Sequence, residues 1–291
     1  MKNIFLTGVT GNTGSHIVKE LEQTNSKLTA LVKESSPENT INGLRKKGLN
    51  VIKGDVINPK SYQSQLSKTD VALLNVGNSS KQLELEKAYI DVSKNSSLKH
   101  LVKFSAFSAD DSSPSEILAV HGKSENYLKK ERTPYTIVRP NFFMQNILMQ
   151  AENIKRDNAF YLPMADTKVA TIDIRDIATF FKTVLLNERD FENKEFNITG
   201  PEIISFHDMA NILSEVLGRT IKYVPITHEQ FENSLQRFGL DNWTINALSE
   251  LNQYVQQQDA MAHKTDDYEK VTGKRPRTFK QFIEGHRNIF V

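Results

Sequence analysis

The sequence predicts an α/β protein whose main domain is a doubly wound parallel sheet, with a smaller and mostly helical lobe. Three observations favour this class. Short β-branched runs alternate with amphipathic segments through the first 140 residues, a glycine-rich turn follows the first run, and the last third of the chain has a polar, helical pattern. Parallel strands need long crossovers to reach their neighbours, so this alternation is typical of a sheet covered by helices on both faces.

The first expected element is a strand at residues 4–7, which enters a turn with glycine at positions 8, 11 and 14. A helix is expected directly after this turn. Glycine allows a sharp turn and a close approach of phosphate to the backbone, while a helix N-terminus attracts negative charge. We interpret the turn as a dinucleotide site, with a purely structural glycine turn as the alternative. Its candidate binding residues are Gly8, Thr10, Gly11, Asn12, Thr13 and Gly14.

Further β-branched runs are expected to be strands of the same sheet, and amphipathic segments between them are expected to be helices. A helix face is indicated by the i, i+3, i+4, i+7 spacing of four apolar residues, Leu85, Ala88, Tyr89 and Val92. Polar or Gly/Pro residues bound each run, as they do at strand ends. The expected strands are residues 28–32, 51–53, 71–75, 101–105 and 135–138.

Beyond residue 140 the pattern loosens. Residues 171–176 indicate a strand and then the start of a helix, and residues 196–200 indicate a further strand. These features place one more part of the sheet late in the chain. We therefore expect a dinucleotide-binding domain at residues 1–155, with residues 169–199 returning to it, and a substrate lobe at residues 156–168 and 200–291.

Composition excludes several classes of function. With 37 basic and 35 acidic residues, the formal charge of +2 produces no field that would attract nucleic acid. The chain has no cysteine, which excludes disulfides, thiol nucleophiles and zinc–thiolate sites, and its histidines show no metal-ligand spacing. No stretch approaches the roughly 20 apolar residues of a membrane span, and the first strand is not a signal sequence. A cytoplasmic protein without a metal site is expected.

Seven short motifs follow one another along the chain, at residues 7–14, 54–56, 104–108, 133–140, 143–146, 173–178 and 198–202. Together they resemble the NmrA-like proteins, which are atypical short-chain dehydrogenases. That family includes NADPH:quinone oxidoreductases of the type-2 kind, triphenylmethane reductases and NADP(H)-sensing regulators. The resemblance extends to about Tyr223 and implies a Rossmann domain that carries NAD(P), with a small C-terminal substrate lobe.

The end of the second strand distinguishes NADP from NAD, because a cation there pairs with a 2′-phosphate and an acid with a ribose 2′-hydroxyl. Lys33 follows this strand, and Ser35 and Ser36 add hydroxyl donors. NADP is therefore favoured over NAD. Against this, lysine binds phosphate less well than the arginine that the family often has here, and Glu34 could repel the phosphate. Lys33 could also be an ordinary solvated residue.

Other cofactor positions follow from the resemblance and from the expected strand ends. Asp55 resembles the family residue that bonds the adenine amino group, with Val56 contributing through its backbone; a turn-forming aspartate is the alternative. Asn75 and Gly77 follow the fourth strand, where the ribose should pass along the carboxyl ends of the sheet, although loop chemistry would also place these residue types there. The remaining expected cofactor contacts are Ser105, Pro140 and Phe142.

The expected catalytic chemistry depends on the absence of a tyrosine–lysine pair. Many short-chain dehydrogenases carry a tyrosine and a lysine four residues apart on one helix face, with the tyrosine as acid or base. Glu125 resembles the glutamate four residues beyond that lysine, so His121 stands at the lysine position and Ile117 at the tyrosine position. Isoleucine cannot transfer a proton, so alcohol dehydrogenation and epimerisation by this route are not expected. Lys123 lies about 200° from His121 around a helix and is expected to face solvent.

His121 is the candidate catalytic residue, because related quinone and dye reductases resemble this chain in placing a histidine there. An ordinary imidazole pKa near ~6.5 would let it donate a proton or bind a substrate oxygen as hydride arrives. The alternative is that His121 only bonds the nicotinamide ribose or its own neighbours. Three other polar residues are expected to be structural rather than catalytic: Tyr127, Arg139 and Asn146.

The family places the residues after the sixth strand over the nicotinamide ring. Phe143 and Met144, which follow Phe142 there, are the expected substrate-binding residues. Flat apolar side chains suit a planar quinone or dye and exclude water from the hydride path. Ordinary core packing is the alternative.

Two functions therefore remain open. The first is an NAD(P)H-dependent oxidoreductase that passes hydride to a small electrophilic acceptor such as a quinone, without a Tyr/Lys dyad. The second is a non-catalytic NADP(H)-binding redox sensor of the NmrA type, which presents a surface to a protein partner; an isomerase-like activity is a third alternative. An open aromatic pocket favours the reductase, and a crevice filled by side chains favours the sensor. A monomer or homodimer is expected.

Overall fold

The computed structural model describes residues 1–291, which form two compact units. The expected domain boundary at residue 155 lies later than the observed one, which follows Arg139. The backbone gives the reason, because Met144 N–H donates to Ile172 C=O at 3.0 Å and so bonds this stretch within the second unit. Unit 1 contains Met1–Asp111, Val120–Arg139 and Ile177–Phe196, and unit 2 contains Ser112–Ala119, Pro140–Asp176 and Asn197–Val291.

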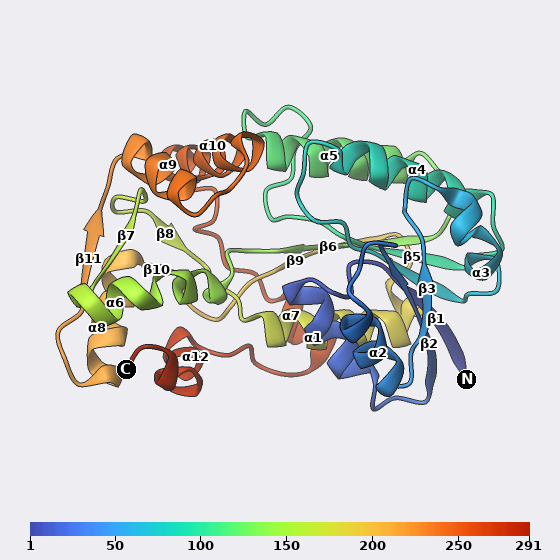
Figure 1. Cartoon of the computed structure of the whole chain (residues 1–291), viewed down its shortest axis with the longest axis horizontal. Coiled ribbons are helices and arrows are strands. Elements are labelled where there is room, and N and C mark those ends of the chain that lie inside the picture. The colour runs from blue at the N-terminus through green and yellow to red at the C-terminus, as the bar shows by residue number, and fades with distance from the viewer. The chain divides into compact units, whose positions relative to one another are not determined.

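Unit 1 is built on a seven-stranded sheet with the strand order β3-β2-β1-β4-β5-β6-β9 (Figure 1). The neighbouring pairs from β3 to β6 run parallel, which confirms the predicted doubly wound sheet. All six strands expected before residue 140 are present. The strands are β1 (Lys2–Leu6), β2 (Ser26–Val32), β3 (Asn50–Lys53), β4 (Val71–Leu74), β5 (His100–Phe104), β6 (Tyr135–Pro140) and β9 (Lys194–Ile198).

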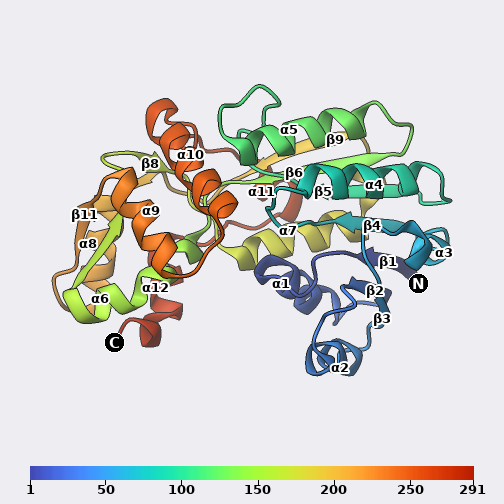
Figure 2. The ribbon, with the colours of Figure 1, turned by 45° about the horizontal axis from the view of Figure 1, so that its top comes forward.

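Helices cover both faces of this sheet. Figure 2 shows α4 and α5 over one face and α1, α2 and α7 over the other. The expected helix is found as α4, but its buried side differs from the expected face. Of the four expected residues only Tyr89 is buried, where it stacks on Tyr62 with ring centroids 5.5 Å apart, and the others are half-buried. The buried residues are Gln82, Glu86, Tyr89, Ile90 and Ser93. The helices are α1 (Asn12–Leu21), α2 (Glu38–Lys46), α3 (Gln63–Leu66), α4 (Gln82–Lys94), α5 (Glu116–Lys129) and α7 (Ile174–Leu186), with 3-10 turns at Pro59–Ser61 and Glu188–Phe191.

Unit 2 is mostly helical and has two small sheets. In one, β7 (Ala159–Leu162) pairs in parallel with β11 (Lys222–Pro225); in the other, β8 (Lys168–Val169) pairs antiparallel with β10 (Ile204–Ser205). Helices α9 and α10 pack side by side. The helices are α6 (Ala151–Asp157), α8 (Phe206–Leu217), α9 (His228–Arg237), α10 (Asn242–Gln258), α11 (Asp267–Thr272) and α12 (Phe279–Gly285), with 3-10 turns at Met144–Gln150 and Arg287–Ile289.

Local sequence explains where several of these helices begin. Ser205 and Asp208 form a reciprocal capping box at the start of α8, and Thr227 with Gln230 does the same for α9.

The expected strand at residues 171–173 is absent, because Ile172 makes only an isolated bridge to Phe143 before α7 begins. No helix in either unit has the length and apolar character needed to cross a bilayer.

Candidate functional site

The glycine turn of unit 1 is shaped by two close backbone approaches. Gly8 has φ +68°, and a Cβ added there would lie 2.4 Å from the carbonyl oxygen of Asn75. A Cβ added at Gly14 would lie 2.0 Å from the carbonyl oxygen of Gly8. No side chain fits at such distances. Gly8 and Gly14 are therefore required by the fold itself.

Gly11 differs from the other two glycines because it is exposed and has room around it. An added Cβ would meet only the carbonyl oxygen of Gly8, at 3.4 Å. Gly11 is the extended N-cap of α1 and has no side chain that could bond the N–H groups of the first helical turn. Thr10 and Asn12 are also exposed, and Thr13 is half-buried. The start of α1 is thus open to an anion, which fits the pyrophosphate of a dinucleotide.

The ends of β1 and β4 are joined by a side chain. Thr7 Oγ1 donates to Leu73 C=O at 3.0 Å and accepts from Asn75 N–H at 2.8 Å. This arrangement places Asn75 against Gly8, so the structure brings these two expected cofactor residues together. Gly77 is exposed, and an added Cβ would find no atom within 4 Å. A ribose contact at Asn75 and Gly77 stays a prediction.

Lys33 is exposed directly after β2, where the sequence predicts the 2′-phosphate. Its carbonyl oxygen accepts from Ser36 N–H at 2.9 Å, which closes a turn. The next strand supplies a second cation, because Lys53 is the register partner of Val32 and forms an ion pair with Glu38 at the start of α2. Sequence reasoning missed Lys53. The parallel register of β2 and β3 is the signal that would have identified it.

Asp55 and Val56 take part in local bonds. Asp55 is exposed, and its Oδ1 accepts from Ile57 N–H at 3.1 Å, as a turn-forming aspartate does. The carbonyl oxygen of Val56 accepts from Tyr62 O–H at 3.0 Å. The structure therefore supports the turn-forming role of Asp55, and the adenine contact stays a prediction.

His121 is 5% exposed and lies beside a buried ion pair of unit 1. Lys103 Nζ of β5 is 2.5 Å from Glu86 Oε2 of α4, and both side chains are fully buried. Gln82 Nε2, also of α4, lies 3.1 Å from Glu86 Oε1 and 3.3 Å from His121 Nε2. We call these four residues the Gln82 cluster. Three of them, Gln82, Glu86 and Lys103, carry no signal in the sequence, because only the packing of α4 and α5 on β5 brings them together.

The Gln82 cluster controls the charge on His121. Burial, and then the positive charge of Lys103, lower the pKa of His121 to about 4. Burial, the largest single influence, would raise the pKa of Glu86, but Lys103, through its charge and its hydrogen bond, acts together with His121 and Ser124 to hold this pKa below the usual value. The expected pKa of His121 near ~6.5 is therefore wrong for this environment, since a charged ring here would lose its hydration. His121 is neutral at pH 7.

Ser105 is enclosed at the end of β5. Its Oγ donates to Glu125 Oε1 at 2.5 Å, and Arg139 Nε donates to the same oxygen at 2.8 Å. Arg139 also pairs with Glu195. These contacts support the structural role expected of Arg139 and give Ser105 the same local function, so its cofactor contact stays a prediction. Lys123 is exposed, as expected.

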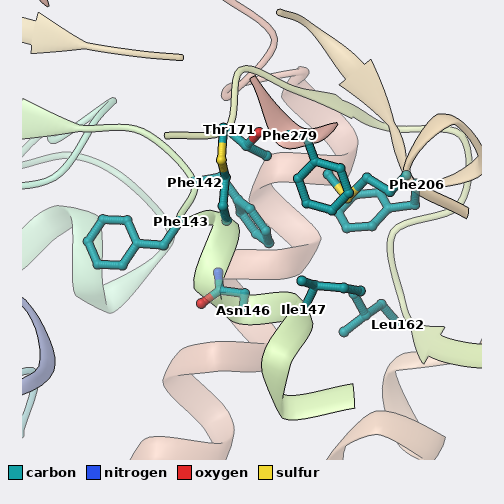
Figure 3. A pocket seen from close by; sticks show the side chains of 10 residues that line it. Phe142, Phe143, Asn146, Ile147, Leu162, Thr171, Phe206 and Phe279 are labelled. Carbon is teal, nitrogen blue, oxygen red and sulfur yellow. The ribbon is translucent and has the colours of Figure 1, made fainter. Parts of the chain in front are cut away.

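Unit 2 contains a small apolar pocket (Figure 3). Phe142 packs edge-on against Phe206 with ring centroids 5.9 Å apart. The cavity volume is about 10 Å³, room for about one water molecule, so the lining side chains nearly fill it. Its main lining residues are Phe142, Met144, Ile147, Leu162, Phe206 and Phe279.

The residues after β6 enter this pocket in different ways. Pro140 is buried at the end of β6, and Met144 is 1% exposed. Figure 3 shows the ring of Phe143 turned away from the rings of Phe142, Phe206 and Phe279. Asn146, expected to be structural, also lines the pocket. Sequence reasoning missed Phe206 and Phe279, because no local pattern links residues so distant in the chain. No group of His, Asp and Glu side chains in the chain could hold a metal ion.

Comparisons with known proteins agree with the fold. A family model described as the NmrA-like family matches residues 1–283. An NAD(P)H azoreductase of Xenophilus azovorans is 31% identical over 287 residues, which cover 99% of each chain. An NADPH-dependent quinone oxidoreductase of Escherichia coli, solved with NADPH, has a TM-score of 0.87 at 21% identity and covers 98% of this chain and 100% of its own. A triphenylmethane reductase of Citrobacter sp., solved with NADP(H), has a TM-score of 0.84 at 20% identity, with coverages of 97% and 99%.

Proposed function

The chain belongs to the NmrA-like family, and from this premise we propose that it is an NAD(P)H-dependent oxidoreductase that passes hydride to a small electrophilic acceptor such as a quinone. The observation that carries the proposal is the exposed Gly11 at the uncapped start of α1, because it leaves backbone N–H groups to a pyrophosphate. The relatives support the same cofactor class, since one is named for NAD(P)H and two were solved with NADPH or NADP(H).

In this proposal the turn Gly8–Gly14 binds the pyrophosphate and Asn75 with Gly77 lies along the ribose. Lys33 binds the 2′-phosphate of NADPH, and Lys53 adds a second positive charge nearby. Two cations at the end of neighbouring strands support a preference for NADPH over NADH.

The bound dihydronicotinamide supplies the hydride, so this chain's residues position the acceptor and control water and protons around it. Ile117 is buried at the position of the usual tyrosine, and His121 is neutral at pH 7. No strong acid is therefore offered for proton transfer. Acceptors whose reduced form is stable as an anion, such as quinones, suit this chemistry better than ketones do. The aromatic pocket of unit 2 is the proposed site for the apolar part of the acceptor.

A second candidate is a non-catalytic NADP(H) sensor that signals to a protein partner. The small cavity favours it, because about 10 Å³ does not admit a ring unless lining side chains such as Phe142 rotate away. The two candidates predict the same cofactor binding and differ only in turnover.

The test combines a titration with an oxidation screen. NADPH and NADH are titrated first by the change in nicotinamide fluorescence. NADPH oxidation is then followed with quinones, azo dyes, triphenylmethane dyes and aldehydes as acceptors. A simple ketone and the secondary alcohol that it forms on reduction, the alcohol pair, test for ordinary alcohol dehydrogenase activity. Turnover with quinones or dyes and none with the alcohol pair supports the reductase. Tight NADPH binding without turnover of any acceptor would favour the sensor, and absence of binding would refute both.

A further inference from the structure

The Gln82 cluster fixes which atoms donate and which accept. Lys103 lies 2.5 Å from Glu86 and keeps that carboxylate ionised, so Glu86 can only accept hydrogen bonds. The nitrogen of the Gln82 amide must therefore face Glu86, because the amide oxygen in that place would repel the carboxylate. The amide has two N–H groups. One donates to Glu86 Oε1 at 3.1 Å, and the other is directed at His121 Nε2 at 3.3 Å.

This orientation determines the protonation of the imidazole ring. A nitrogen that accepts a hydrogen bond carries no proton, so the single proton of neutral His121 lies on Nδ1. His121 Nδ1 is buried and has no protein partner. A buried N–H without a partner is costly, which indicates that an acceptor atom from a ligand or a bound water completes it.

We propose that Gln82 is a positioning residue which, held by Glu86 and Lys103, fixes His121 as the Nδ1–H tautomer and so makes Nδ1–H a hydrogen-bond donor for a carbonyl-type oxygen of the bound acceptor. The ligand's identity rests on the proposed function, whereas the tautomer does not. As hydride reaches the acceptor, negative charge grows on such an oxygen, and a neutral N–H donor stabilises it without transferring its proton.

A second buried histidine supplies an internal control. His100 Nε2 lies 2.8 Å from Thr136 Oγ1, and that hydroxyl donates its own proton to Phe191 C=O at 2.8 Å. Thr136 must therefore accept from His100, which requires the opposite tautomer, Nε2–H. One protein thus holds two buried neutral histidines whose tautomers are expected to differ.

The experiment is ¹⁵N-histidine NMR of the full-length protein at pH 7 without ligand, in which long-range ring correlations distinguish the two tautomers. The signal of His121 is identified by its loss in His121→Asn, and that of His100 by its loss in His100→Asn. We expect Nδ1–H at His121 and Nε2–H at His100. Gln82→Met should move His121 toward Nε2–H and leave His100 unchanged. Nε2–H at His121 in the unmodified protein, or an unchanged tautomer in Gln82→Met, overturns the proposal.

Turnover provides a second measurement. If His121 were only structural, turnover would not depend on where the substituted side chain places its amide nitrogen. The amide nitrogen of asparagine occupies the place of Nδ1, and that of glutamine the place of Nε2. His121→Gln should therefore have a kcat about 5-fold below that of His121→Asn, with the same Kd for NADPH in both variants. The reverse order overturns the donor role. Failure of every acceptor in the unmodified protein would refute the proposed reductase, while the tautomer assignment is still decided by the NMR spectrum.

Discussion

Gly14 packs so closely on Gly8 that a Cβ on Gly14 would lie 2.0 Å from the carbonyl oxygen of Gly8. Gly11, between them in the sequence, has only a 3.4 Å contact to the same oxygen. The three glycines of one motif therefore have separable roles. Gly8 and Gly14 make the turn, and Gly11 keeps it accessible.

Gly11→Val should weaken NADPH binding by at least about tenfold, because the side chain would occupy the path of the pyrophosphate. Its free energy of unfolding should change by no more than about 1 kcal/mol, the cost of a poorer N-cap. Gly14→Ala is the contrasting variant and should lose more than about 3 kcal/mol of stability. Fluorescence titration and urea unfolding measure the two quantities. Unchanged NADPH affinity in a folded Gly11→Val protein would contradict the site.

Lys33→Ala should weaken NADPH binding more than NADH binding, by on the order of 1 kcal/mol, because only NADPH carries the 2′-phosphate. Lys53→Ala should act in the same direction with a smaller effect, since Lys53 already pairs with Glu38. Lys27→Ala, an exposed lysine near the other end of β2, is the control. The measurement is the Kd of each variant for both dinucleotides. An equal loss of affinity for NADPH and for NADH would show that neither lysine contacts the 2′-phosphate.

The free energy of unfolding should fall as the pH drops from 6.5 to 4. Burial is the main cause that lowers the pKa of both His100 and His121 to about 4. In this window the unfolded chain binds a proton at each ring that the folded protein does not, so acid favours unfolding. Well above pH 6.5 both rings are neutral in both states, and the contribution is fully present. Each ring accounts for about 3 kcal/mol at pH 4.

Urea unfolding at pH 7, 5.5 and 4 measures this dependence. Because carboxylates also titrate, the informative quantity is the difference between variants. The free energy of unfolding of His121→Asn should fall less across this pH window than that of the unmodified protein. His263→Asn, which replaces an exposed histidine, is the control. The same slope in His121→Asn and in the unmodified protein would show that the buried ring does not resist protonation.

Met209→Ala should enlarge the apolar pocket, because Met209 is 2% exposed and lines it. If the pocket holds the acceptor, kcat/KM should rise for two-ring quinones relative to one-ring quinones, despite a stability cost of about 2–5 kcal/mol. Met149→Ala, which replaces a methionine that is 70% exposed, is the matched control. If the unmodified protein, Met209→Ala and Met149→Ala show the same ratio of kcat/KM for two-ring and one-ring quinones, the acceptor binds outside this pocket.

Gly122→Ala should destabilise unit 1. A Cβ on this α5 residue would lie 2.3 Å from Asp111 N and 2.4 Å from the carbonyl carbon of Asp110. The clash should outweigh the gain of about 1 kcal/mol that alanine brings to a helix interior. Gly43→Ala in α2 meets no atom within 4 Å and should gain that stability. Thermal unfolding of the two variants compares them, and two shifts of the same sign would contradict the close approach at Gly122.

The sheet and the glycine turn could be predicted because their signals are local. The expected strand at residues 71–75 begins with four consecutive apolar residues, which is the pattern of a buried strand, and three glycines over seven residues define the turn. The isolated bridge at Ile172 shows the limit of this reasoning. A strand-like run becomes a strand only when a neighbour of matching length lies beside it, and Phe143 provides a single pair.

The candidate site could be predicted only in part, for the same reason. Lys103 gives no sign of a partner within its own strand, β5, until α4 packs over it and brings Glu86 within 2.5 Å. The pKa of His121 is lowered first by burial and then by the charge of Lys103, and both arise from packing between segments, so no property of its own segment could indicate this shift. Phe206 and Phe279 likewise reach Phe142 from more than 60 residues away.

The place of β9 beside β6 has a consequence for biosynthesis. β6 ends at Pro140, but its sheet neighbour spans Lys194–Ile198 and leaves the ribosome much later. At about 5–20 residues per second the interval lasts roughly 3–12 s. Throughout it, the nascent dinucleotide-binding unit displays β6 as an unpaired edge, the kind of surface on which chains aggregate. This protein should therefore depend most on chaperones while residues 140–198 are being translated.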